Sequence, residues 1–209
     1  MSKSENKAKA QDRRQEIMEA SIMAFAEHGY HNTTIHDIVD KTTFKSVGTI
    51  FKYFPKPSRE HSVKDDILRS IFEDKITLLT DSARQQTEKE DEATAKIKAF
   101  LDHHFDHLQK KKSLAKVLQI ELRQSHHFLQ DYNYKKLQGY LAVLDAAIDL
   151  GKRNGELKSV VPTTVVRWAI FGAIDEISTT WVLTDGAWPK DINSISKDIM
   201  TMFIDGMKV

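Results

Sequence analysis

The segment from residue 33 to residue 54 most constrains the fold, because it predicts two short helices joined by a tight turn. Its sequence is TTIHDIVDKTTFKSVGTIFKYF. Thr34 is a suitable N-cap for the first helix, and Asp37, three residues later, completes a capping box. The poor helix formers at 41–43 are expected to end that helix, and Ser46 is a suitable N-cap for the next. This spacing is typical of a helix-turn-helix, although an ordinary helical hairpin with a solvated basic face has the same pattern.

The second helix of this pair has the residue types that a DNA-binding helix needs. Its apolar positions are Val47, Ile50, Phe51 and Phe54, and small polar or basic residues occupy its other faces. In a helix-turn-helix, the second helix enters the major groove with its N-terminal end first, and a glycine such as Gly48 lets the backbone approach closely. The candidate DNA contacts, to base edges or to the sugar-phosphate backbone, are Thr33, Thr34, Lys45, Ser46, Val47, Gly48, Thr49, Lys52, Tyr53 and Lys64.

Composition limits the class of protein. The chain has 209 residues, of which 40% are hydrophobic, enough for a packed core. It has no cysteine, which excludes a disulfide framework and thiolate metal sites and agrees with a reducing cytoplasm. The first residues lack the apolar core of a secretory signal, and the longest apolar stretch, 168–183, falls short of a membrane span. We therefore expect a cytoplasmic protein with no membrane partner.

The net charge is only +1, yet basic residues are concentrated at the N-terminus. Lys3, Lys7, Lys9, Arg13 and Arg14 lie within the first fourteen residues. They are either a basic arm that adds nonspecific attraction to phosphate or a frayed, solvated terminus.

From Arg14 to Phe54 the chain resembles the DNA-binding domain of the tetracycline-repressor (TetR) family. Three pieces carry the resemblance: RRQEIMEASIMAFAEHGY, TTIHDIVDK and SVGTIFKYF. In that family the first helix braces the helix-turn-helix, and Gly29 stands where such a helix would stop. The resemblance implies a DNA-binding transcriptional regulator rather than an enzyme.

Three departures from the family pattern affect the DNA side. The turn at 42–46 is one residue longer than usual and lacks a glycine, and Phe51 replaces a tyrosine whose hydroxyl often contacts phosphate in relatives. A Pro-rich insert follows at 55–61, which its two prolines make extended rather than helical.

The rest of the chain predicts helices only, so the fold class is all-α. Helices are expected at about 65–87, 93–108, 113–122, 128–153 and 163–184, with a last one after Pro189 that extends to 204. The expected organisation is an N-terminal three-helix helix-turn-helix domain, residues 1–64, and a C-terminal ligand-binding and dimerisation bundle, residues 65–209.

The last two predicted helices carry more apolar surface than one neighbouring bundle would cover, which favours an isologous homodimer. A dimer would place two recognition helices about one DNA turn apart, to match a palindromic operator. The candidate interface residues are Gly172, Ile174, Ile177, Trp181, Ile199 and Phe203.

Histidines at 103 and 107 are spaced to share one metal ion, but helical phase turns both outward and no third ligand is evident. No catalytic triad, phosphate-binding loop or dinucleotide-binding fingerprint is present. We therefore expect no catalytic residue, no metal and no cofactor.

Three further segments, 118–125, 137–145 and 170–183, resemble a TetR-fold subgroup that regulates fatty-acid metabolism. The resemblance implies a repressor of fatty-acid degradation genes that releases its operator when long-chain acyl-CoA binds. A helical bundle with apolar and aromatic walls can hold an acyl chain, and a cation such as Arg123 suits the CoA phosphates.

The candidate ligand contacts are Phe100, His104, Phe105, Leu108, Leu118, Leu122, Arg123, Tyr140, Leu144, Trp168 and Phe171. Plain core packing explains most of them equally well. Two other functions fit the pattern: a regulator that senses another amphipathic molecule such as a drug, and an all-helical lipid-binding protein or enzyme that does not bind DNA.

Overall fold

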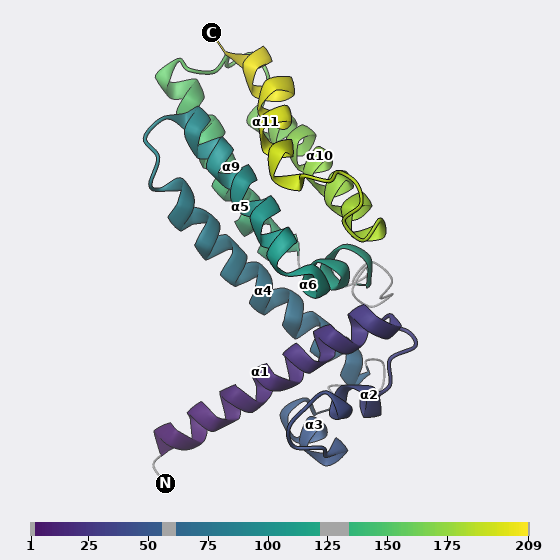
Figure 1. The fold of residues 1–209 in the computed structure, drawn as a ribbon. Coiled ribbons are helices and arrows are strands. Elements are labelled where there is room, and N and C mark those ends of the chain that lie inside the picture. The colour runs from purple at the N-terminus through teal and green to yellow at the C-terminus, as the bar shows by residue number, and fades with distance from the viewer. Residues whose placement is uncertain (1–2, 56–61, 122–133, 209) are drawn as a thin grey trace. The chain divides into compact units, whose positions relative to one another are not determined.

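The computed structural model describes residues 3–55, 62–121 and 134–208 (Figure 1). Apart from one isolated bridge between Leu157 and Lys208, every regular element in these ranges is a helix, which confirms the all-α prediction. The first four helices are α1 (Lys3–His28), α2 (Ile35–Asp40), α3 (Val47–Tyr53) and α4 (Val63–Thr87). Next come α5 (Ala93–Lys110), α6 (Lys112–Lys116), the π-helical turn η1 (Val117–Glu121) and α9 (Tyr134–Asn154). The chain ends with α10 (Thr163–Leu183), η2 (Ile192–Ser194), α11 (Ile195–Ile199), η3 (Met200–Ile204) and η4 (Asp205–Met207).

Most predicted helices are present with small changes at their ends. The helix expected at 113–122 is α6 followed directly by η1, and the one expected at 128–153 is described only from Tyr134. The last expected helix is not one continuous α-helix, because α11 is flanked by the 3-10 turn η2 and the π-helical turn η3. Of the Pro-rich insert at 55–61, residues 56–61 lie outside the described ranges.

The chain divides into two compact units, and the division differs from the expected boundary at residue 64. Unit 1 comprises Met1–Asp74 and Ser113–Tyr132, whereas unit 2 comprises Lys75–Lys112 and Asn133–Val209. The boundary after Asp74 lies within α4, which continues without a break from Val63 to Thr87. The segment that contains η1 belongs to unit 1, where η1 packs against α1.

Unit 1 is built around α1, which contacts both α2 and α3. The buried residues of α1 include Ile17, Ala20, Ala24 and Phe25, and Ile38 and Ile50 from the next two helices are also fully buried. Gly29 ends α1 with a φ of +79°, a left-handed conformation that glycine adopts without strain. This glycine stop confirms the prediction from sequence.

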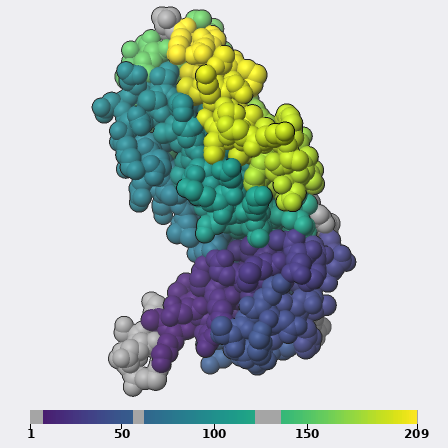
Figure 2. Space-filling model, viewed as in Figure 1, coloured from purple at the N-terminus to yellow at the C-terminus, as the bar shows by residue number. Residues whose placement is uncertain are grey.

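Unit 2 is built around α5 and α9, which make extensive contact. Phe100 and Tyr140 hold their ring centroids 4.8 Å apart at this contact. The carboxylate of Glu156 accepts hydrogen bonds from the backbone N–H groups of Ala93 and Thr94, both at 3.2 Å, and so caps the start of α5. The last turns of the chain, yellow in Figure 2, lie at the surface of this unit.

Candidate functional site

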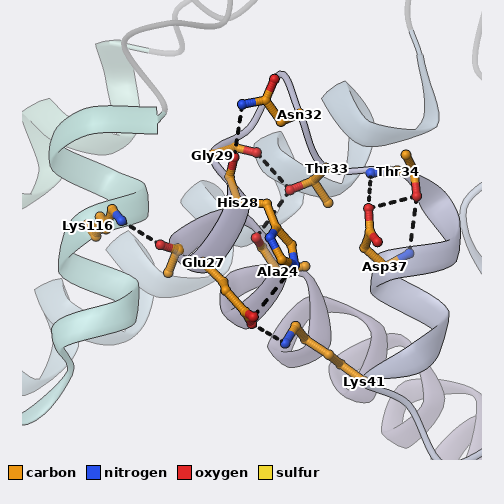
Figure 3. Close-up of polar contacts among 11 residues, drawn as sticks. Ala24, Glu27, His28, Gly29, Asn32, Thr33, Thr34, Asp37, Lys41 and Lys116 are labelled. Atoms are coloured by element: carbon orange, nitrogen blue, oxygen red, sulfur yellow. Dashed lines mark hydrogen bonds and ion pairs between the residues drawn. The ribbon is translucent and has the colours of Figure 1, made fainter.

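The start of α2 is fixed by the predicted capping box (Figure 3). The Thr34 hydroxyl accepts a 3.2 Å hydrogen bond from the backbone N–H of Asp37, whose carboxylate accepts one of 2.7 Å from the backbone N–H of Thr34. These hydrogen bonds, the backbone one first, lower the pKa of Asp37. Because both orphan donors are satisfied, the entry to the helix-turn-helix has a single defined geometry.

Two candidate DNA contacts instead brace the loop between α1 and α2. Thr33 is only 2% exposed, and its hydroxyl donates to the carbonyls of Gly29 at 2.7 Å and Ala24 at 3.2 Å. The Lys64 ammonium donates to the carbonyls of Tyr30, at 2.8 Å, and Thr33, at 2.7 Å. A third bond of 3.3 Å, to the carbonyl of His31, uses its last proton. Desolvation lowers the pKa of Lys64. Both polar groups are therefore used within unit 1, and contact of Thr33 and Lys64 with DNA stays a prediction.

The turn between α2 and α3 forms without the usual glycine because Lys45 adopts the left-handed conformation, with a φ of 49°. The Lys45 ammonium also donates to the carbonyl of Asp40, at the end of α2. Thr43 is held from α1, since its backbone N–H and its hydroxyl both donate to the Glu16 carboxylate at 2.6 Å. Hydrogen bonds from Thr43 lower the pKa of Glu16. The longer turn is therefore an ordered part of the module.

The turn before α3 and the helix itself carry the candidate DNA contacts between residues 45 and 53. Ser46 occupies the N-cap position as predicted, but its side chain makes no capping hydrogen bond. In this stretch residues 45, 46, 48 and 52 are exposed, and residues 47, 49 and 53 are half-buried. The inner side is formed by Ile50 and Phe54, which are both fully buried. Phe51 was expected to face inward with them, but its side chain is 46% exposed.

Arg14 anchors the C-terminal end of α3, a role that the sequence did not indicate. Its guanidinium donates to the carbonyl of Tyr53 at 2.9 Å and to the Ser70 hydroxyl at 2.7 Å, and it lies 4.0 Å from the centre of the Phe54 ring. From the sequence, Arg14 is expected in either a basic arm or a frayed, solvated terminus. Its position three residues before the buried Ile17 was the available signal, because such residues share one helical face.

A second contact that the sequence did not indicate holds η1 and the end of α6 against the end of α1. The Lys116 ammonium donates to the carbonyl of Ala26 at 2.6 Å (Figure 3). The Glu121 carboxylate accepts a 2.7 Å hydrogen bond from the backbone N–H of Tyr30, just beyond the glycine that ends α1. All four residues belong to unit 1. This segment therefore supports the helix that braces the helix-turn-helix.

Two candidate ligand contacts of unit 2, His104 and Tyr140, form a polar triad with the buried Ser178. His104 places one ring nitrogen 3.0 Å from the Tyr140 hydroxyl and the other 3.2 Å from the Ser178 hydroxyl. Burial lowers the pKa of His104 to about 3, so the imidazole is neutral at physiological pH. Burial also raises the pKa of Tyr140. Ser178 was not among the predicted residues, although its four-residue spacing from the apolar Ile174 places it on the inner face of α10.

The other candidate ligand contacts separate into three groups. Phe100, Phe105, Leu108 and Leu144 are buried in unit 2, as either a core or a ligand wall requires. Leu118 is half-buried on η1 in unit 1, and Leu122 and Arg123 lie outside the described residues.

The third group is Trp168 and Phe171, whose ring centroids are 6.0 Å apart. Phe171 is half-buried, but Trp168 is 41% exposed, which corrects its placement in an apolar wall. On α10 the neighbouring residue Arg167 points inward instead, and its guanidinium forms a 2.7 Å ion pair with Asp145 on α9.

The histidines at 103 and 107 lie near each other on α5. His103 pairs with the Ser82 hydroxyl at 2.9 Å, and its ring centroid is 6.1 Å from that of His107. Desolvation is the largest cause that lowers both pKa values. Among the residues that the structure describes, no three His, Cys, Asp or Glu side chains gather as metal ligands.

Half of the predicted dimer interface lies in the protomer's own core. Ile174, Trp181 and Ile199 are almost completely buried within one chain, so their assignment to an interface between chains is corrected. Gly172 is exposed, and Ile177 and Phe203 are half-buried. Apolar spacing alone does not distinguish a face that packs within one chain from a face that packs against a second chain.

Within the described ranges, no helix is long and apolar enough to cross a membrane.

The capped α2, the ordered turn and the braced α3 define a helix-turn-helix DNA-binding module. Residues 17–60 match the family of bacterial regulatory proteins called the tetR family, and residues 72–206 match the C-terminal region of YsiA-like proteins. The chain belongs to the TetR family of transcriptional regulators, which confirms the expectation of a regulator rather than an enzyme.

Three relatives cover nearly the whole chain. The fatty acid metabolism regulator protein of Bacillus subtilis is 32% identical over 192 residues, which span 92% of this chain and 94% of the relative. The fatty acid degradation regulator FadR from Bacillus halodurans has a TM-score of 0.82 at 31% identity and covers 93% of this chain and 95% of its own. FadR from Bacillus subtilis in complex with stearoyl-CoA has a TM-score of 0.81 at 31% identity, with coverage of 92% and 98%. These similarities confirm the resemblance to fatty-acid regulators.

Proposed function

We propose that this chain is a cytoplasmic repressor of fatty-acid degradation genes, which binds a palindromic operator as a homodimer and releases it when long-chain acyl-CoA binds. One observation carries the proposal: the chain is 31% identical, over 92% of its length, to a FadR whose structure contains stearoyl-CoA. Similarity over this length includes both the helix-turn-helix and the helical bundle.

The exposed side of α3 supports the DNA-binding part of the proposal. Ser46, Gly48 and Lys52 are exposed on a helix whose opposite side is buried and whose C-terminal end Arg14 holds. The small side chains at the N-terminal end of α3 allow that end to enter a major groove, and a lysine one turn later can bind phosphate. Lys45 contributes from the preceding turn if its bond to Asp40 is exchanged for phosphate.

The interior of unit 2 supports the ligand part. An acyl chain needs apolar and aromatic walls, which Phe100, Phe105 and Leu144 provide. The neutral polar triad around His104 suits the uncharged thioester carbonyl, because it can donate a hydrogen bond without burying a charge.

The homodimer is supported by an apolar stripe on α10. Val165, Trp168, Ala169 and Gly172 are all exposed, and their spacing places them on one face of the helix. Such a stripe is typical of a surface that a partner covers. Ala169→Glu is expected to convert a dimer to a monomer in sedimentation equilibrium, and a wild-type protein that sediments as a monomer would overturn the dimer.

Stearoyl-CoA titrated into a complex of the protein with its selected operator tests the ligand response. Allosteric coupling of about 1–3 kcal/mol corresponds to an affinity decrease of about 5- to 150-fold. Coenzyme A and stearate, titrated separately, are the matched controls for the two halves of the ligand. Unchanged operator affinity at saturating stearoyl-CoA rules out this effector and leaves a TetR regulator of another amphipathic molecule.

A further inference from the structure

Phe51 is a large apolar side chain on the DNA-facing helix that the protein itself leaves uncovered. It is 46% exposed, although Ile50 before it and Phe54 after it are fully buried. In the part of the chain that the structure describes, no aromatic ring or cation stacks on its ring. The ring is therefore available to an external partner.

The position of Phe51 on α3 directs its ring towards the groove-entering end of the helix. Helical side chains lean towards the N-terminus, and Gly48 is three residues earlier on the same side. A Cβ added at Gly48 would meet only the Ser46 hydroxyl, at 3.7 Å. The ring of Phe51 thus lies beside open space at the part of α3 that approaches bases.

The chemistry of the ring selects what it can contact there. A phenyl ring has no hydrogen-bond donor or acceptor, so it cannot bind phosphate as the hydroxyl of a tyrosine does. The apolar feature of the major groove is the C5 methyl group of thymine. Exposed Lys45 and Lys52 are near it in sequence and suit the flanking phosphates.

We propose that Phe51 packs against a thymine methyl group and so determines the operator's sequence at one position in each half-site. This inference rests on the proposed operator binding. It makes Phe51 a specificity-determining residue that acts by apolar contact.

Deoxyuridine substitution tests the contact, because it removes only the methyl group from a chosen thymine. An operator is first selected from a random duplex pool with the wild-type protein, and each thymine is then replaced in turn. We expect one thymine in each half-site at which replacement weakens binding about fourfold, the value of one buried methyl group. For Phe51→Ala the ratio of the two affinities at that position is expected to fall to about one.

Two variants serve as controls. Phe51→Tyr keeps the ring and is expected to keep most of the methyl dependence. Lys52→Ala is expected to weaken binding to both duplexes equally and to leave their ratio unchanged.

The possible results distinguish a failure of operator binding from a failure of the methyl contact. If the wild-type protein enriches no duplex from the pool, the DNA-binding function itself is overturned. If it binds a selected operator but tolerates deoxyuridine at every thymine, the methyl contact is overturned and the regulator remains. A fourfold ratio that persists in Phe51→Ala also overturns the assignment, because another residue then contacts the methyl group.

Discussion

The carboxylate of Glu121 accepts a 2.7 Å hydrogen bond from the backbone N–H of Tyr30, a residue 91 positions earlier. Glu121 is only 4% exposed, so loss of its acceptor would leave a buried N–H group unsatisfied. We expect Glu121→Ala to lower the free energy of unfolding by about 1–3 kcal/mol. Glu121→Gln retains an acceptor oxygen and should be less destabilised. Urea denaturation of both variants measures the difference, and equal destabilisation would contradict a role as acceptor.

Lys45→Gly should stabilise the turn of the helix-turn-helix. A non-glycine residue in the left-handed region, as Lys45 is at a φ of 49°, costs about 1–2 kcal/mol. Glycine removes this cost, but its greater conformational freedom in the unfolded chain offsets part of the gain in stability. We therefore expect Lys45→Gly to exceed Lys45→Ala in free energy of unfolding by about 1 kcal/mol. Both variants lack the lysine side chain, so their difference reports the backbone conformation alone. Identical urea midpoints for Lys45→Gly and Lys45→Ala would contradict a strained backbone at this position.

The parts of unit 1 that could be predicted from the sequence are those that neighbouring residues determine. The capping box pairs Thr34 with Asp37, three residues away, and Gly29 ends α1 by its own conformation. In unit 2, Gly155 has the same left-handed conformation just after α9. Local chemistry is enough for each of these features.

The residues that brace the site could not be predicted, because their partners are distant in sequence. Arg14 and Tyr53 are 39 positions apart, and Lys64 and Thr33 are 31 apart. A basic residue near a DNA-binding motif suggests contact with phosphate, but the side chains of Arg14 and Lys64 donate to backbone carbonyls of unit 1. Apolar periodicity also failed to distinguish the two sides of α10, where Trp168 is outward and Ile174 inward.

Two glycines of α9 make a matched pair with opposite expectations. A Cβ added at Gly139 would meet nothing within 4 Å, so Gly139→Ala should raise the free energy of unfolding by about 0.5–1 kcal/mol through helix propensity. A Cβ at Gly151 would lie 2.8 Å from two side-chain carbons of Leu157 and 3.0 Å from the Cβ of Ala93. Leu157 is buried, and forced overpacking typically costs about 1–3 kcal/mol. Thermal or urea unfolding should therefore separate the variants in opposite directions, and a stable Gly151→Ala would contradict the close packing.

Lys52→Ala should weaken operator binding without changing sequence preference. Lys52 is exposed on α3, and a lysine that binds phosphate reads no base. We expect the slope of log affinity against log salt concentration to fall by about one for each phosphate that the variant no longer neutralises. Lys197→Ala, at an exposed position on α11 in unit 2, is the matched control for charge alone. An equal change of slope in the two variants would show that net charge, and no local interaction, is responsible.

Acidification should destabilise the protein through His104, whose folded pKa is about 3 against 6.5 for an unperturbed imidazole. Between these values the unfolded chain binds a proton that the folded chain does not. The stabilising contribution of the neutral ring is therefore complete above pH 6.5 and decreases as the pH falls below it. At about 1.4 kcal/mol per pH unit, the free energy of unfolding should drop by roughly 2 kcal/mol between pH 6.5 and pH 5.

His104→Gln removes this titration while it keeps polar atoms near Tyr140 and Ser178. His103 and His107 also have lowered pKa values, so a residual slope of the same sign should remain in this variant. His36→Gln, at an exposed position on α2, is the control for the exchange of a histidine for glutamine. Urea denaturation at pH 7.5, 6.0 and 5.0 and one protein concentration measures each slope. If His104→Gln is destabilised by acidification as much as the wild type, the neutral buried imidazole is not the source of the effect.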